Sequence, residues 1–239
     1  MLFNIIQSLI NGQGFDAASA FADILASVAV IILILPFHEY AHGWAAKKLG
    51  DSTAQYAGRL TFNPLASVDP IGALFLILFG FGWAKPVPID PRYFKHPKRD
   101  MALTALAGPL ANLLASLVCG ILYNLVILLG GGSVTLGTYP SNIVLQFLLL
   151  FFSAATTINI SLAAFNLLPI PPLDGSRILG MFLSNRAMQA YYRYERYIIW
   201  GIFALLLFGF LDVPLQFLQR VFTVGVMTLA DLPFHLLGV

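Results

Sequence analysis

The sequence predicts an all-α polytopic membrane protein with a short membrane-associated β-ribbon and a re-entrant helix. Of its 239 residues, 59% are hydrophobic and only 10% are charged, whereas about 25% of the residues of a soluble domain are charged. Several apolar runs approach or exceed the ~20 residues that a helix needs to cross a bilayer. We therefore expect one integral membrane domain over residues 1–239.

Charge and cysteine content do not indicate a nucleic-acid partner or a site built from cysteines. The net charge of +2 does not indicate a nucleic-acid partner, because the basic residues cluster in short loops between the apolar runs. The single Cys119 lies inside an apolar run, so the sequence predicts neither a disulfide framework nor a cysteine metal site. The partner that the composition does predict is the lipid bilayer.

The first predicted span covers residues 18–48 and carries the sequence His38-Glu39-Tyr40-Ala41-His42. Residues four apart lie on the same face of a helix, so the two imidazoles could bind one ion with Glu39 beside them. In this H-E-x-x-H pattern two histidines bind zinc and the glutamate acts as general base. The alternative is a pair of core histidines, but ionisable side chains within a span are costly unless they are paired or bind a metal.

Three shorter segments follow the first span. Residues 52–63 are rich in strand-forming residues and contain Gly58, which predicts a β-hairpin or ribbon. Asp69-Pro70 predicts a helix cap with proline at the first helical position, and the apolar run after it is too short to cross, which favours a re-entrant helix. Residues 84–100 contain four prolines and five basic residues, which predicts an extended loop at an aqueous surface.

The second half of the chain contains the remaining spans. Residues 101–129 and 142–168 are long apolar runs, and each predicts one span. A polar amphipathic stretch over residues 177–196 precedes a predicted span near residues 197–211, and a last apolar segment ends near residue 237. We therefore expect C-terminal transmembrane helices over about residues 197–237.

The orientation of the spans follows from the basic residues. Eleven of the thirteen lie at Lys47-Lys48, in residues 85–99 and in residues 177–196. The positive-inside rule places these three segments in the cytoplasm. Residues 50–85 then begin and end on the cytoplasmic side, so they are expected to enter the membrane and return. The H-E-x-x-H motif accordingly lies towards the cytoplasmic side.

A catalytic zinc site usually has three protein ligands and an open position, so two histidines leave one ligand to find. Asp174 is the candidate, because it follows a Pro-rich break at the end of a span, where an unpaired carboxylate would be costly. Its expected position level with His42 favours this interpretation over a simple turn with an Asp cap. His96, in the basic loop, and His235, near the C-terminus, are interpreted as surface residues.

Two motifs in this order are similar to those of a known family. The sequences FHEYAHG at residues 37–43 and NLLPIPPLDG at residues 166–175 together resemble the site-2 protease family of intramembrane zinc metallopeptidases. The sequences GRLTFNP at residues 58–64 and AGP at residues 107–109, with Asn112, resemble its compact bacterial and archaeal members, which lack PDZ-like and CBS-like domains. The resemblance covers about residues 36–178.

The resemblance implies a three-helix catalytic core within about residues 18–178 and a location in a prokaryotic cell membrane. It implies His38, His42 and Asp174 as the ligands of Zn²⁺, Glu39 as the base, and transmembrane segments of other proteins as substrates. Asn159 resembles the active-site asparagine of the family, and such an amide could bind the substrate or the developing oxyanion. For Asn159, and equally for Asn112, an amide that joins two spans is the alternative.

These observations predict a zinc metalloendopeptidase that hydrolyses peptide bonds of transmembrane segments within the membrane. One alternative is a zinc-binding membrane protein without hydrolytic activity, against which the intact Glu39 argues. The other alternative is an ion-coupled transporter. Transporters favour repeated halves and ionisable groups near the bilayer midplane, whereas these groups lie near one face and the sequence shows no repeat.

Overall fold

A computed structural model describes residues 24–25, 28–67, 69–72, 74, 85–132 and 142–238. The described residues form helices and loops without a β-strand, which confirms the predicted all-α class. In chain order the elements are the π-helical turn η1 (Val30–Ile34), α3 (Leu35–Leu49), α4 (Thr53–Tyr56), α5 (Pro64–Ser67), the 3₁₀ turn η2 (Pro91–Tyr93), α7 (Pro97–Leu129), α8 (Ile143–Asn166), α9 (Asp174–Gly180), α10 (Asn185–Leu207) and α11 (Asp212–Leu237).

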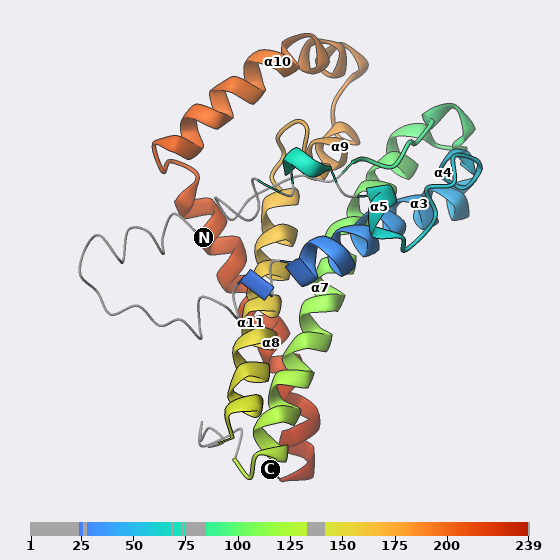
Figure 1. The fold of residues 1–239 in the computed structure, drawn as a ribbon. Coiled ribbons are helices and arrows are strands. Elements are labelled where there is room, and N and C mark those ends of the chain that lie inside the picture. Colours follow the sequence, from blue (N-terminus) through green and yellow to red (C-terminus); the bar gives the residue numbers. More distant parts are fainter. Residues whose placement is uncertain are drawn as a thin grey trace.

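Helices α7, α8 and α11 form the long bundle of Figure 1, and α7 packs against α3, α8, α9 and α11. At one end, Val126 and Ile127 of α7 meet Leu149 of α8 in a buried cluster. Where α7 meets α11, a Cβ added at Gly120 would lie 3.1 Å from the Cβ of Ala230, so these small residues let the two backbones approach closely. Helix α7 is therefore the centre of the fold.

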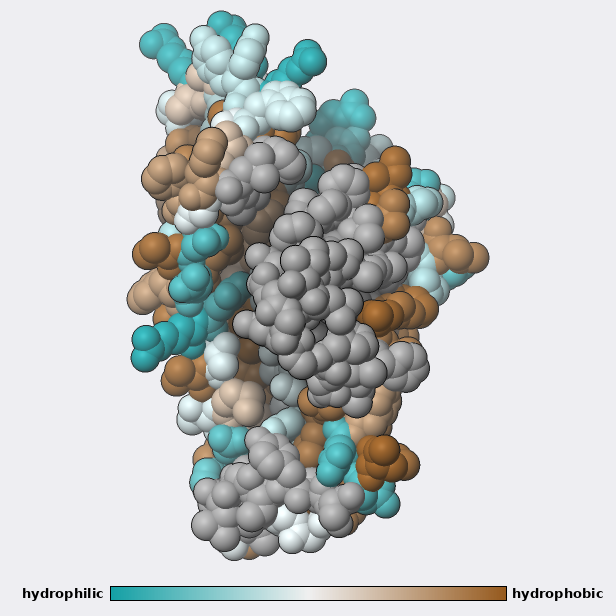
Figure 2. Space-filling view, turned by 60° about the vertical axis from the view of Figure 1, so that its left-hand side comes forward, coloured by the Kyte–Doolittle hydropathy of each residue, from teal (hydrophilic) through white to brown (hydrophobic). Residues whose placement is uncertain are grey.

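Three helices of the described chain, α7, α8 and α11, are long and apolar enough to cross a membrane, which supports the predicted membrane protein. Their exposed side chains include many large apolar residues, as lipid contact requires. On the face seen in Figure 2, hydrophobic residues are exposed along both sides, and hydrophilic residues lie at the top, along part of the left side and near the bottom.

Not every predicted span has this form. Helix α10 joins residues 185–196 of the predicted polar stretch to residues 197–207 of the predicted span in one helix, and it is not among the three candidate spans of the described chain. The described part of the predicted first span, residues 24–25 and 28–48, is helical, and its remainder lies outside the described residues.

A proline lies at the start of helix α3 and a glycine at its end. Pro36 lies in its first turn, directly after η1. Since proline cannot donate the hydrogen bond of a continuing helix, it explains the irregular turn before α3. Gly50 ends the helix at φ 115°, which glycine adopts readily, and its N–H donates to the carbonyls of Ala46 and Lys47.

The predicted β-ribbon at residues 52–63 is wrong. Residues Thr53–Tyr56 instead form the short helix α4, and Gly58 turns the chain at φ 67°. The physical reason is local: the buried carboxylate of Asp51 accepts hydrogen bonds from the N–H and hydroxyl of Thr53, at 2.9 and 2.5 Å, and so stabilises a turn in place of an extended strand. The segment then packs against α3, where the Phe62 ring stacks on Tyr40 at 4.2 Å.

The next segment, which begins at Asp69, has the predicted helix cap in the part that the structure describes. The Asp69 carboxylate accepts a hydrogen bond of 2.8 Å from Gly72 N–H, which confirms the predicted cap. The predicted re-entrant helix falls largely on residues 73 and 75–84, which lie outside the described residues. Asp90 N–H nevertheless donates to Asp51 Oδ2 at 2.7 Å, so the chain leaves α3 and returns to the same place.

Candidate metal centre

His38 and His42 lie one turn apart on the buried face of α3, as the motif spacing predicts. Their side chains are almost fully buried, and their Nε2 atoms lie 3.0 Å apart. The two rings meet edge to face, with centroids 4.6 Å apart. Helix α3 therefore presents two imidazole nitrogens to one point.

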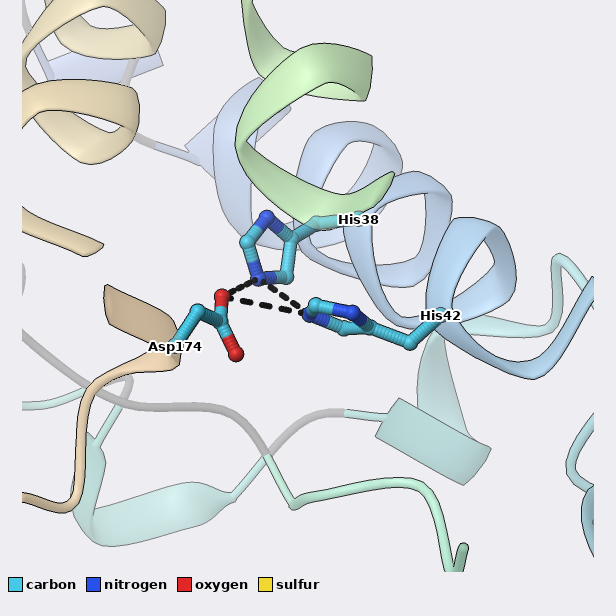
Figure 3. A group of neighbouring side chains, drawn as sticks. All are labelled: His38, His42 and Asp174. Carbon is cyan, nitrogen blue, oxygen red and sulfur yellow. Dashed lines mark hydrogen bonds and ion pairs between the residues drawn. The ribbon is translucent and has the colours of Figure 1, made fainter. Parts of the chain in front are cut away.

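Asp174 meets these histidines from the other end of the sequence. Its Oδ2 atom lies 3.3 Å from Nε2 of His38 and 3.2 Å from Nε2 of His42, and Figure 3 shows the three side chains converging. The following residue explains the placement, because a Cβ at Gly175 would lie 2.3 Å from the carbonyl oxygens of Leu167 and Leu168. A glycine here lets the start of α9 pack directly on the end of α8.

Helix α7 determines which nitrogen each imidazole presents. His42 Nδ1 donates to the backbone carbonyl of Thr104 at 2.8 Å, and His38 Nδ1 donates to Asn112 Oδ1 at 3.0 Å. Because both partners are acceptors, the proton of each neutral ring resides on Nδ1. Both Nε2 atoms therefore present lone pairs to Asp174, as the outer hydrogen bonds of metal-binding histidines usually arrange.

The convergence of three acceptors fits a metal ion. Asp174 Oδ2 is buried without a hydrogen-bond partner, and its lone pair faces two imidazole lone pairs. Such a cluster is repulsive unless a cation lies among the three atoms. Zinc ligands at about 2.0–2.1 Å in a tetrahedron are roughly 3.3 Å apart, which agrees with the observed 3.0, 3.3 and 3.2 Å. Within the described chain, His38, His42 and Asp174 form the one group that could hold a metal ion.

A positive charge among the three atoms determines the charge state of Asp174. Burial acts to raise the pKa of its carboxyl, and protonated imidazoles of His42 and His38 would hold that pKa below its ordinary value. With the proton of each neutral ring on Nδ1, the positive charge has to come from a bound cation, which favours the ionised carboxylate in the same way.

Gly108 explains how α7 comes so close to the histidines. A Cβ at this position would lie 2.3 Å from His42 Nε2 and 2.5 Å from His38 Cε1. No other residue type leaves room for both rings without a shift of the helix. The AGP motif at residues 107–109 therefore has a packing role beside the imidazoles.

Glu39 is also buried, at 8% exposed, and its Oε2 atom accepts a hydrogen bond of 2.9 Å from the backbone N–H of Val87. It shares a cavity of about 370 Å³ with the three clustered residues. The cavity is mainly apolar, with polar groups from α3, α7, α8 and α9, and it is lined by Leu35, His38, Glu39, His42, Pro86, Val87, Ile89, Asn112, Leu162, Phe165, Asn166, Pro172, Leu173, Asp174 and Arg177.

The structure separates the two predicted asparagines. Asn112 lines the cavity, and its Oδ1 is bound to His38 while its buried Nδ2 has no partner. Asn159 is fully buried, donates to the Ala155 carbonyl of its own helix at 2.8 Å, and is not among the cavity-lining residues. His96 and His235 are both exposed, as predicted.

Two contacts of the site were missing from the sequence analysis. The Thr104 carbonyl and the Val87 N–H are backbone groups, so the residue types at these positions do not predict the contacts. Val87 does carry one usable signal, because it lies between Pro86 and Pro88, which favour an extended chain with few competing donors.

Comparisons with known proteins agree with this site. The family model "Peptidase family M50" matches residues 26–210. "Putative zinc metalloprotease YwhC" of Bacillus subtilis (strain 168) is 42% identical over 152 residues, which cover 63% of this chain and 66% of that protein. "Putative zinc metalloprotease Rip2" of Mycolicibacterium smegmatis is 28% identical over 179 residues, which cover 70% of this chain and 63% of that protein. The match thus spans just under two thirds of each relative, and no solved structure matches the chain.

Proposed function

Because this chain belongs to peptidase family M50, we propose that it is a zinc-dependent endopeptidase that cleaves transmembrane segments of other proteins within the membrane. One observation carries the proposal: Nε2 of His38, Nε2 of His42 and Oδ2 of Asp174 converge beside the Glu39 carboxylate in one cavity. The names of the two relatives, each of which reads "Putative zinc metalloprotease", support the choice of metal and reaction.

The proposed catalysis divides the work between the metal and Glu39. When bound by His38, His42 and Asp174, zinc would polarise the scissile carbonyl and lower the pKa of water towards ~7. Glu39 takes the proton of the attacking water and passes it to the leaving amine. Asn112 Nδ2, a buried donor without a partner beside His38, is suited to binding the developing oxyanion.

The cavity favours an unwound substrate. A helix hides its carbonyls in backbone hydrogen bonds, so a transmembrane segment must open at the cleavage point before Glu39 and the metal can act on it. The mainly apolar wall suits the side chains of such a segment. Basic residues lie at the C-terminal end of α3 and at the N-terminal end of α7. They support a site that faces the cytoplasm of a prokaryotic cell.

The deciding experiment compares the wild type with Glu39→Gln, which preserves the shape of the side chain and removes proton transfer. Membrane peptides that accumulate in cells carrying the variant are candidate substrates, and each is then incubated with purified protein in lipid vesicles. We expect cleavage to fall by on the order of 10²-fold or more while the zinc content stays at one ion per chain.

Glu195→Gln is the matched control, because it makes the same chemical change on α10, outside the cavity. Equal cleavage by the wild type and Glu39→Gln would remove Glu39 as the base. Absence of any cleaved peptide from a zinc-loaded wild type would point instead to a zinc-binding protein without hydrolytic activity.

A further inference from the structure

Residues 85–90, which we name the strap, form one wall of the cavity. The sequence KPVPID has prolines at positions 86 and 88. Proline fixes its own φ and favours an extended conformation in the residue before it. Pro86, Val87 and Ile89 of the strap line the cavity. The strap therefore runs past the Glu39 carboxylate and the metal-binding cluster.

Both ends of the strap are anchored. At the first end, Lys85 N–H donates to the Ser67 carbonyl at 2.8 Å, and the Lys85 carbonyl accepts from Arg59 Nη2 at 2.6 Å. At the second end, Asp90 N–H donates to Asp51 Oδ2 at 2.7 Å. The anchors come from the polypeptide that immediately follows α3, so the strap is tied to the helix that carries Glu39.

Of these anchors, Asp51 is the one that acts through a buried carboxylate. Its side chain is fully buried, and each of its oxygens is used, Oδ1 by Thr53 and Oδ2 by Asp90. A buried carboxylate is costly unless hydrogen bonds satisfy it. The local turn at Thr53 satisfies only Oδ1, and the bond to the strap satisfies Oδ2.

The middle of the strap contacts Glu39. Val87 N–H donates to Glu39 Oε2 at 2.9 Å, and this bond restricts a side chain that otherwise has several rotamers. A general base must stay within hydrogen-bond reach of the proton that it abstracts. The strap supplies a fixed donor for one carboxylate oxygen, so the other oxygen can take up the proton in a defined position.

We propose that Asp51 is a positioning residue for catalysis: by anchoring the strap, it holds Val87 N–H against Glu39 and so keeps the carboxylate in place for proton transfer. This inference rests on the proposed function, because it gives Glu39 a reaction to perform. It does not assign Asp51 any contact with metal or substrate.

Asp51→Asn tests the proposal, because an asparagine has the same size but only one acceptor oxygen for the three donors that the carboxylate binds, which are Thr53 N–H, the Thr53 hydroxyl and Asp90 N–H. We expect kcat to fall roughly tenfold, a part of the 10²–10⁴-fold that a general base contributes, with KM and zinc content unchanged. Deuterium exchange of the peptide covering residues 85–90 should become faster. Thr53→Val is the matched control: it removes the hydroxyl partner of Oδ1, leaves the Asp90 bond intact, and should preserve kcat.

A second variant covers the case in which Asp51→Asn does not fold. Val87→Pro removes the N–H that holds Glu39, keeps the extended chain between two prolines, and leaves both anchors in place. It should lower kcat to a similar degree while the Asp90 amide stays protected from exchange. Unchanged kcat in a variant with faster strap exchange, or equal losses of zinc and cleavage in Asp51→Asn, would overturn the proposal.

One measurement keeps this proposal separate from the proposed function. In Glu39→Ala the Val87 amide loses its acceptor and should exchange faster, whether or not the protein cleaves peptides. Unchanged exchange there would disprove the contact itself. Full cleavage by Glu39→Gln would instead disprove the role of Glu39 as base and leave the exchange result standing.

Discussion

The backbone carbonyl of Thr104 on α7 accepts a hydrogen bond of 2.8 Å from His42 Nδ1 on α3. Because a carbonyl oxygen can only accept, this bond holds the proton on Nδ1 and leaves the Nε2 lone pair facing Asp174. The orientation of the imidazole therefore depends on how α7 packs against α3, which the predictions for Asn112 and Gly108 test.

Loss of any one predicted ligand should release the metal. His38→Ala, His42→Ala and Asp174→Ala each remove one of the three converging atoms, so each purified variant should lose most of the zinc that the wild type holds. Metal analysis of protein in detergent measures this directly, and His235→Ala, which alters an exposed histidine, should keep full zinc content. Retention of zinc by Asp174→Ala would remove Asp174 from the ligand set.

Loss of the Asn112 side chain should weaken zinc binding without abolishing it. Asn112→Ala removes the acceptor that orients His38, and outer hydrogen bonds of this kind typically contribute about 10–100-fold in metal affinity. A chelator competition titration gives the affinity. Asn124→Ala is the control on the same helix, because Asn124 is equally buried but bonds to Ala230 and Asp231 of α11. Equal affinities in both variants would contradict a positioning role for Asn112.

A methyl group at Gly108 should disrupt the metal site. In Gly108→Ala the new Cβ would lie 2.3 Å from His42 Nε2 unless α3 and α7 separate, so we expect loss of most zinc and of cleavage. Gly201→Ala adds the same methyl group on α10, where nothing lies within 4 Å of it, and should behave like the wild type. A zinc-replete Gly108→Ala protein would show that the helices can adjust, and that the metal site does not require glycine at this position.

Cysteine labelling tests the predicted topology. The Asp51–Asp90 hydrogen bond brings the two sides of the intervening segment together, so single cysteines at the exposed positions Gln55 and Arg92 should both be labelled from the cytoplasmic side. A cysteine at Ile143, the first residue of α8, should be labelled from the outside only. Cys119 is replaced first. Labelling of Gln55 and Arg92 from opposite faces would contradict the predicted orientation.

The predicted elements that the structure reproduces depend on patterns within one segment. The apolar runs at residues 101–129 and 142–168 appear as α7 and α8, because length and hydrophobicity are properties of the run itself. The cap at Asp69 likewise involves only residues three apart. The predicted ribbon at residues 52–63 is absent because composition alone does not show which side chains bind the backbone. There the Asp51 carboxylate binds Thr53 and stabilises a turn, which outweighs the strand-forming composition.

The sequence by itself determined the spacing of His38 and His42, because four residues make one helical turn, and it singled out Asp174 by the cost of an unpaired carboxylate near a membrane. Only the tertiary structure decided what surrounds them. The Thr104 carbonyl at His42, the Asn112 amide at His38 and the Val87 N–H at Glu39 come from segments 48 to 74 positions away in sequence. Two of these three groups belong to the backbone, which every residue carries, so only the packing of α7 and the strap against α3 reveals which of them meet the site.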